Sequence, residues 1–226
     1  MTLQAELRRR LKALGDPKDA AQMQRYMKSA LPYFGVKSTP MRAVFREVMA
    51  GYAPASAAAW KRDVLTLWRG AGHREERYAA LALCAHRGAR AFQRFEALPL
   101  YEELIVTGAW WDLVDEVAGS RLPVLLQADR VAMTKAMRTW SRCGDLWKRR
   151  ASIICQLKLN DEIDLELLYD CIEPSLSSKE FFLRTAIGWA LRQYAKRDPD
   201  EVARYVEEMG ERLSGLSRRE ALKHIV

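Results

Sequence analysis

The sequence is poor in metal-binding residues and lacks the common motifs for metals and nucleotides. Its 226 residues include four cysteines and three histidines, without C-x-x-C spacing or zinc-finger spacing. There is no P-loop, no G-x-G-x-x-G after a strand, no H-E-x-x-H, and no H-x-E with P-C-x-x-C. Nucleotide hydrolysis, zinc proteolysis and zinc deamination therefore lack support. We expect neither a metal nor another cofactor.

Long apolar runs are also missing. No stretch reaches the roughly 18 apolar residues that a membrane-spanning helix needs. The opening residues 1–7 begin an amphipathic helix and lack the apolar core of a signal peptide. Unpaired cysteines, mostly with apolar neighbours, are typical of a reducing compartment. We therefore expect a cytoplasmic protein that does not bind membranes.

Positive charge is in excess. Lys and Arg total 37 against 29 Asp and Glu, which gives a net charge of +8 and a pI near 9.4. Hydrophobic residues make up 49%, so the chain has enough apolar material to fold. The charge favours a polyanionic partner, with nucleic acid ahead of an anionic membrane or an acidic protein.

Nearly every segment has a hydrophobic period close to 3.6 residues, and alternating strand patterns are absent. Helix starts are indicated by Asp16-Pro17, Thr39-Pro40 and Asp198-Pro199, where a capping residue precedes a first-turn proline. Ile153 and Ile154 would also suit a strand, but their neighbours favour a helix. We predict helices at 2–14, 18–31, 40–51, 55–69, 74–88, 91–107, 109–118, 121–127, 129–142, 145–158, 161–173, 178–196, 199–209 and 217–225.

The predicted helices are short and come in pairs of roughly 40 residues, which is typical of HEAT or armadillo repeats. The repeats are degenerate in sequence, and no low-complexity linker divides the chain. We therefore predict an all-α fold, an α-α superhelix (a curved solenoid) of HEAT-like repeats, forming a single domain over residues 1–226. A compact helical bundle is the alternative.

Residues 108–119 contain an unusual pair of side chains. On a helix, one face would be buried, formed by Trp110, Leu113, Val114 and Val117. Trp111 and Asp115 are four residues apart and would stack one above the other beside that face. Because a carboxylate would weaken binding of a polyanion, Asp115 indicates a role in chemistry. The alternatives are that Trp111 is a peripheral core residue and that Asp115 is a solvated charge or pairs with an arginine such as Arg150.

Two further helices combine aromatic and basic residues on faces that we expect to be exposed. One has Trp147, Arg149, Arg150 and Lys158, and the other has Thr185, Trp189, Arg192 and Lys196. Cations for phosphates and rings for sugars or bases are what a nucleic-acid surface needs. The alternative for each helix is a solvated face with a partly buried tryptophan. Three such helices in one basic chain favour a nucleic-acid surface.

The chain resembles the AlkD-like family of DNA glycosylases, DNA alkylation repair enzymes built of HEAT-like repeats. The resemblance covers nearly the whole chain in ordered segments. They are Arg25-Tyr26-Met27-Lys28 with Gly35-Val36, Glu102 to Thr107, Trp110-Trp111-Asp112-x-Val114-Asp115, Trp147-x-x-Arg150-Ala151, Gln156-Leu157-Lys158, Ser177 to Phe182 with Ala186-Ile187-Gly188-Trp189-x-Leu191-Arg192, and Arg219 to Ile225. One departure is that Gly35 to Pro40 is one residue longer than the family pattern, which affects an expected loop contact of residues 37–39.

The resemblance implies a specific set of site residues. The catalytic carboxylate corresponds to Asp115, the two sugar-facing tryptophans to Trp111 and Trp189, and the phosphate-anchoring arginine to Arg150. DNA-binding positions are Tyr26, Lys28, Arg42, Arg149, Lys158, Arg192 and Lys196. The implied substrate is double-stranded DNA carrying N3- or N7-alkylated purines such as 3-methyladenine and 7-methylguanine. The implied role is base excision repair by a monomer that associates with the nucleoid when bound to DNA.

The chemistry of such bases agrees with the single conspicuous carboxylate. An N7-alkylated purine is a cation and departs as a neutral base, so it needs no general acid, unlike the substrates of typical two-carboxylate glycosidases. Two other functions stay open at this point. One is a non-catalytic HEAT-repeat protein that binds damaged or branched DNA, and the other is a HEAT-type adaptor for an acidic protein.

Overall fold

The computed structural model describes residues 2–225, which form helices joined by turns and loops and contain no strand. The α-helices are α1 (Leu3–Leu14), α2 (Pro17–Met27), α3 (Ser38–Val48), α4 (Ala57–Arg69), α5 (Arg74–Cys84), α6 (Leu98–Gly108), α7 (Trp111–Ser120), α8 (Leu122–Ala128), α9 (Arg130–Ser141), α10 (Leu146–Ile154), α11 (Leu165–Ile172), α12 (Phe181–Tyr194), α13 (Pro199–Met209) and α14 (Gly215–Ala221). Short 3-10 turns are η1 (Arg87–Phe92), η2 (Phe95–Ala97), η3 (Asn160–Glu162), η4 (Glu173–Ser175) and η5 (Gly210–Arg212). The predicted all-α fold is confirmed.

Several helix boundaries differ from prediction, and three of these differences have clear local reasons. Helix α2 ends at Met27 because Lys28 is left-handed, with φ of 49°, and the Ser29 amide bonds back to the Gln24 carbonyl. Two 3-10 turns and α6 replace the helix predicted at 91–107, and α6 has a proline in its first turn. Helix α10 ends at Ile154, before the Gln156 side chain bonds to both the amide and the carbonyl of Asp164.

The chain forms two compact units, Met1–Gln93 and Arg94–Val226. We call them the first and the second unit. The first contains α1 to α5 and η1, and the second contains the remaining helices and turns. In both units, contacts are mainly between helices close in sequence, as in a stack of helical repeats. The prediction of a single domain over 1–226 stays a prediction.

A buried glutamate shapes the loop that leads into α3 in the first unit. Glu75 is 1% exposed, and its carboxylate accepts hydrogen bonds from the amides of Phe34, Gly35 and Val36 at 3.0, 2.9 and 3.2 Å. Gly35 is left-handed, with φ of 86°, and a Cβ there would lie 2.1 Å from the Asp16 carbonyl oxygen. Glycine and the charged acceptor together fix the loop, after which α3 begins at Ser38.

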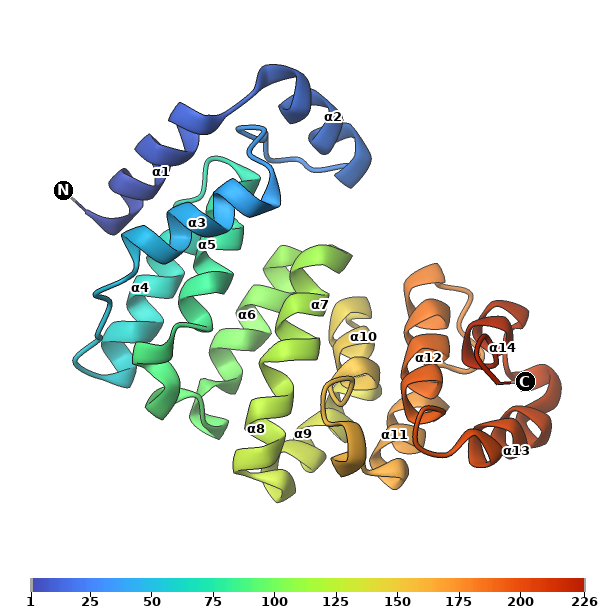
Figure 1. Cartoon of the computed structure of the whole chain (residues 1–226). Coiled ribbons are helices and arrows are strands. Elements are labelled where there is room, and N and C mark those ends of the chain that lie inside the picture. Colours follow the sequence, from blue (N-terminus) through green and yellow to red (C-terminus); the bar gives the residue numbers. More distant parts are fainter. Residues whose placement is uncertain (1, 226) are drawn as a thin grey trace. The chain divides into compact units, whose positions relative to one another are not determined.

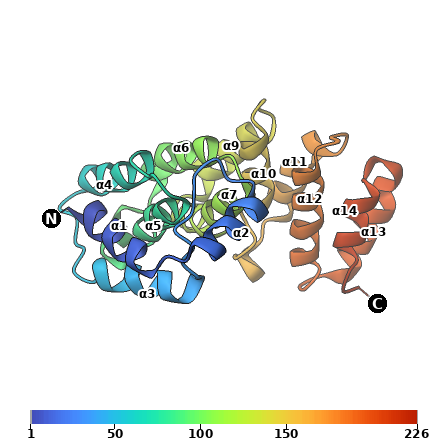
Figure 2. The ribbon, with the colours of Figure 1, turned by 90° about the horizontal axis from the view of Figure 1, so that it is seen from above.

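The second unit contains a row of helices in which each contacts the next. In Figure 1, α7, α10, α12 and α14 follow one another in this order. Helices α9 and α11 contact each other and both contact α10, and they lie along one side of the row (Figure 2). The buried faces are apolar, including Leu113 and Val117 of α7, Ile153 of α10 and Leu191 of α12. This arrangement brings residues about 35 positions apart in sequence onto neighbouring helices.

The close approach of α12 and α14 depends on a glycine. A Cβ added at Gly188 would lie 2.5 Å from the Cβ of Glu220 and 3.0 Å from the Ser217 carbonyl oxygen. Ser217 also donates its hydroxyl hydrogen bond to the Arg184 carbonyl at 2.9 Å. A larger residue at 188 would therefore push α14 away from α12.

We predict that Gly188→Ala lowers the free energy of unfolding by about 1–3 kcal/mol, because a methyl group does not fit against α14. Gly119→Ala is the matched control, since a Cβ at this helical position meets nothing within 4 Å. It should leave stability unchanged or raise it by about 0.5–1 kcal/mol. Urea unfolding of both variants checks this, and equal stability of the two would contradict the packing account.

Candidate active site

Helix α7 presents Trp111 and Asp115 beside its buried face. Ala109, left-handed with φ of 42°, ends α6, and Trp110 is extended at the N-cap of α7. Leu113, Val114 and Val117 are buried, as predicted, whereas Trp111 and Asp115 are half-buried. Trp110, predicted to be buried with them, is only half-buried because it is the N-cap residue that precedes α7. The Asp115 carboxylate therefore lies at the edge of the core, with 22% of its side chain exposed.

A bidentate ion pair joins Asp115 to Arg150 of α10. The Arg150 Nε donates to Asp115 Oδ1, and Nη2 donates to Oδ2, both at 2.7 Å. The Arg150 side chain is only 1% exposed. Parallel N–H bonds to both carboxylate oxygens fix the plane as well as the position of the carboxylate.

The other edge of the Arg150 guanidinium binds α12. Its Nη1 donates to the Phe182 carbonyl at 2.5 Å and to the Thr185 hydroxyl at 3.2 Å. The Trp189 ring centroid lies 5.1 Å from Arg150 Cζ, within cation–π range. Arg150 thus connects α7, α10 and α12 through four hydrogen bonds, and one of its five N–H groups has no protein partner within residues 2–225.

Aromatic side chains enclose the arginine on one side. The ring centroids of Trp147 and Phe182 are 4.9 Å apart, and Trp110 lies 5.5 Å from Phe182 and 6.2 Å from Trp147. Phe182 is itself 5.8 Å from Arg150 Cζ. This cluster keeps water away from the guanidinium, which strengthens its bonds to Asp115.

Two of the faces expected to be exposed are partly buried. Trp147 is 8% exposed, Arg150 1% and Thr185 7%, so the prediction that these three lie on exposed faces was wrong. Lys158 and Lys196, which helical spacing grouped with these residues, lie beyond the ends of α10 and α12. The faces are buried because α7, α10 and α12 pack on one another, which the pattern of a single helix does not indicate.

All four predicted DNA-binding residues of the second unit have protein partners. Arg149 donates to the Pro174 carbonyl and the Ser175 hydroxyl, each at 2.9 Å. Arg192 pairs with Glu220 at 2.5 Å. The amines of the exposed residues Lys158 and Lys196 donate to the Ser120 hydroxyl at 2.5 Å and to Gln193 at 2.8 Å. Their roles in DNA binding stay predictions.

The first unit contains the remaining predicted contacts, Tyr26, Lys28 and Arg42. All three are exposed, and Tyr26 has 77% of its surface accessible. Lys37, in the loop with the expected family contact, pairs with Asp19 at 3.2 Å. Arg42 lines a groove of about 570 Å³ together with Arg46 and Arg87 above Phe45 and Met49. These residues are accessible to a ligand, and their assignment to DNA stays a prediction.

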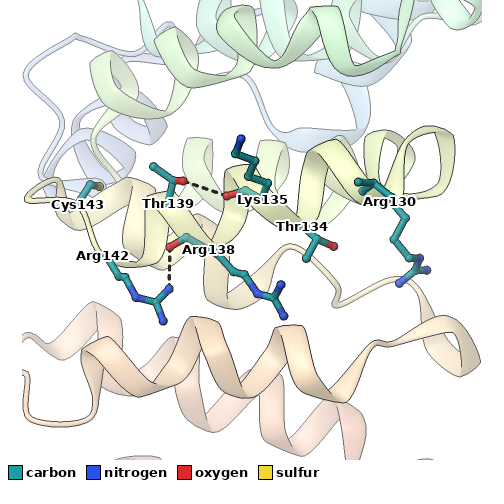
Figure 3. Close-up of a pocket in the computed structure, with 8 residues that line it drawn as sticks. Arg130, Thr134, Lys135, Arg138, Thr139, Arg142 and Cys143 are labelled. Carbon is teal, nitrogen blue, oxygen red and sulfur yellow. Dashed lines mark hydrogen bonds between the residues drawn. The ribbon is translucent and has the colours of Figure 1, made fainter.

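A basic groove on α9 was not anticipated from the sequence. It has a volume of about 910 Å³ and is lined by residues including Arg130, Lys135, Arg138 and Arg142 (Figure 3). Its sequence signal is a series of four cations spaced by five, three and four residues along and just after α9. Arg138 is paired with Glu166 and Asp170 at 2.7 and 2.6 Å, which offsets its charge. None of its lining residues belongs to α7, α10 or α12, so it is separate from the Asp115 site.

Residues 2–225 contain neither a membrane-spanning helix nor a cluster of metal ligands. No helix has the length and apolar character needed to cross a membrane. No group of three or more His, Cys, Asp or Glu side chains is arranged to hold a metal ion.

Comparison with known proteins identifies the family. The family model described as "DNA alkylation repair enzyme" matches residues 7–225, and so spans both units. A solved structure described as a predicted DNA alkylation repair enzyme from Enterococcus faecalis matches with a TM-score of 0.84 at 24% identity, over 94% of this chain and 97% of that chain. No curated protein matches.

The chain belongs to the family of DNA alkylation repair enzymes, as expected from the sequence. The match to the solved structure shows that the two proteins share a fold. Family membership supports a role for this protein in DNA repair.

The buried ion pair makes a prediction about stability. Asp115→Ala leaves the Arg150 charge uncompensated in the core, whereas Arg150→Ala leaves a cavity beside a half-buried, unpaired carboxylate. Each change should lower the free energy of unfolding by about 3–5 kcal/mol. The double variant should be less destabilised than the sum of the two single variants, by at least about 2 kcal/mol. Urea unfolding of all four proteins measures this coupling, and additive effects would show that the pair is not an energetic unit.

The same series tests whether Arg150 binds DNA, as the sequence predicts. Duplex affinity should fall in Arg150→Ala and hold or rise in Asp115→Ala, because a phosphate loses a cation in the first and an opposing anion in the second. Arg138→Ala, in the α9 groove, serves as the control for loss of one positive charge. Unchanged duplex affinity in a folded Arg150→Ala protein would contradict a phosphate contact.

Proposed function

We propose that this protein is a monofunctional DNA glycosylase that hydrolyses the N-glycosidic bond of N3- and N7-alkylated purines in duplex DNA. The observation that supports it best is the geometry of Asp115, a half-buried carboxylate whose two oxygens are held by Arg150 at 2.7 Å. A fixed anion at the edge of a core suits a reaction in which positive charge develops on the substrate.

The leaving base needs little help from the protein. Alkylation at N7 or N3 makes the purine a cation, and cleavage of the glycosidic bond returns the bonding electrons to the base, which departs neutral. No proton has to be supplied, so a second carboxylic acid is not required. The difficult part is the sugar, which becomes an oxocarbenium-like cation as the bond breaks.

Asp115 would stabilise that cation and position the attacking water. An electrostatic contribution of several kcal/mol, about 2–4, is ordinary for one preorganised group in a site that excludes water. Arg150 offsets part of the negative charge of Asp115, yet it also fixes the carboxylate plane, so the exposed edge of Asp115 meets the sugar without rearrangement.

The two tryptophans would hold the sugar from its sides. Trp111 is one helical turn before Asp115 on α7, and Trp189 comes from α12. One face of Trp189 is near the Arg150 guanidinium, with 5.1 Å between Cζ and the ring centroid. The rest of that half-buried ring is available to the sugar, and each cation–π contact would contribute on the order of 0.5–2 kcal/mol.

Base release from a duplex carrying a single 7-methylguanine tests this proposal. Wild type should release the base, and Asp115→Asn should reduce release to background while binding the duplex equally or more tightly. Glu116→Gln is the matched control, because it removes the same charge from the next, exposed residue of α7 and should leave the rate unchanged.

Thermal unfolding first confirms that each variant is folded, and the outcomes then distinguish the possible functions. Release by Asp115→Asn at the rate of wild type would remove the proposed role of Asp115. Tight duplex binding without release by wild type would favour a non-catalytic binder of damaged DNA. Weak binding by wild type would favour an adaptor for an acidic protein.

A further inference from the structure

Thr185 lies behind Arg150 on the side away from Asp115. It is 7% exposed, and its hydroxyl accepts a hydrogen bond from Arg150 Nη1 at 3.2 Å. The same hydroxyl donates to the Phe182 carbonyl at 3.2 Å. The Phe182 carbonyl also accepts from Arg150 Nη1, at 2.5 Å, so the three groups form a closed set of hydrogen bonds.

The guanidinium group is planar and rigid, so fixing one of its edges fixes the other. Thr185 and the Phe182 carbonyl fix the Nη1 edge, and the Nε and Nη2 edge holds both oxygens of Asp115. The position of the carboxylate therefore depends on α12 as well as on its own helix. Without the Thr185 hydroxyl, the Nη1 edge loses one of its two acceptors on α12 and keeps the Phe182 carbonyl, so the guanidinium is held less firmly.

We infer that Thr185 is a positioning residue for the reaction, acting through Arg150 to set the orientation of the Asp115 carboxylate. This inference rests on the proposed glycosylase function. It extends the site to a residue that touches neither the base nor the sugar. It also explains why a hydroxyl group lies at this buried position of α12, although Ala186, Ala190 and Leu191 complete its apolar face.

A purely structural role for Thr185 makes a different prediction. Its hydroxyl would then only satisfy the Phe182 carbonyl, and its loss would lower stability without changing the rate of the folded protein. A positioning role predicts that the chemical step slows while duplex affinity is retained, because Thr185 is not part of the DNA surface. Separate measurement of binding and chemistry therefore distinguishes the two roles.

The test compares Thr185→Val, which keeps the shape of the side chain but removes the hydroxyl, with Thr185→Ser, which keeps the hydroxyl. Single-turnover release of 7-methylguanine and duplex affinity are measured for each. We expect Thr185→Val to be about ten-fold slower than wild type and Thr185→Ser to stay within about two-fold. Duplex affinity should stay within about two-fold for both variants.

Thr139→Val is the matched control. Thr139 is also a helical threonine of the second unit, and its hydroxyl donates to the Lys135 carbonyl at 3.0 Å on α9. Its replacement should leave the rate unchanged. If Thr185→Val does not fold, Thr185→Ala and Thr185→Ser form a second pair that differs by the hydroxyl group, and the slower rate is then expected for Thr185→Ala.

The outcomes separate this inference from the proposed function. If wild type releases 7-methylguanine and Thr185→Val releases it equally fast, the role of Thr185 is overturned and the glycosylase proposal stays intact. Rate and affinity falling together would also overturn it, since the residue would then shape the DNA surface. If wild type releases no base, both proposals fail.

Discussion

The second unit depends on one buried charge. Arg150 is almost completely removed from water, and such a cation is unfavourable unless its N–H groups find partners. Asp115 supplies the opposite charge, while Phe182 and Thr185 supply neutral acceptors. Because the arginine and its partners lie on three helices, satisfying the arginine requires α7, α10 and α12 to pack in one arrangement. The same requirement gives Asp115 a fixed orientation.

The helical repeat makes this arrangement possible without long connections. Each helix of the row contacts the next, so residues about 35 positions apart meet across one interface. The close approach of α12 to α14 at Gly188 extends the packing beyond the site. In the proposed mechanism, the packed helices hold the site in a fixed arrangement. A small number of polar groups near the surface of the row carry out the proposed chemistry.

Much of the fold could be predicted from the sequence, because hydrophobic periodicity and capping residues are local signals. Each predicted helical region contains helix, and three of the four residues expected on the buried face of α7 are buried. The helix ends that differ from prediction depend on features with weak sequence signals. Examples are the left-handed Lys28 and the hydrogen bonds from the Gln156 side chain to the Asp164 backbone. The family was also recognisable from ordered segments along the chain.

The environment of the site was harder to predict. Helical spacing grouped Trp147 with Arg150, and Thr185 with Trp189, but it assigned these faces to solvent. Burial of Arg150 depends on a partner 35 residues away. No pattern within α10 shows that Asp115 will accept hydrogen bonds from both Nε and Nη2 of its guanidinium. Pairing of the two residues was considered only as an alternative to a role in chemistry. In the structure the pair exists, and it orients the carboxylate on which the proposed chemistry depends.

Binding of a duplex that mimics the charged sugar tests whether Asp115 stabilises a cation on the sugar. The probe contains a cationic pyrrolidine in place of one deoxyribose, and the comparison duplex contains a neutral tetrahydrofuran at the same position. If Asp115 stabilises a sugar cation, wild type should bind the cationic duplex at least about ten-fold more tightly, and Asp115→Asn should lose this preference. Equal binding of the two duplexes by wild type, or an unchanged preference in Asp115→Asn, would contradict the account.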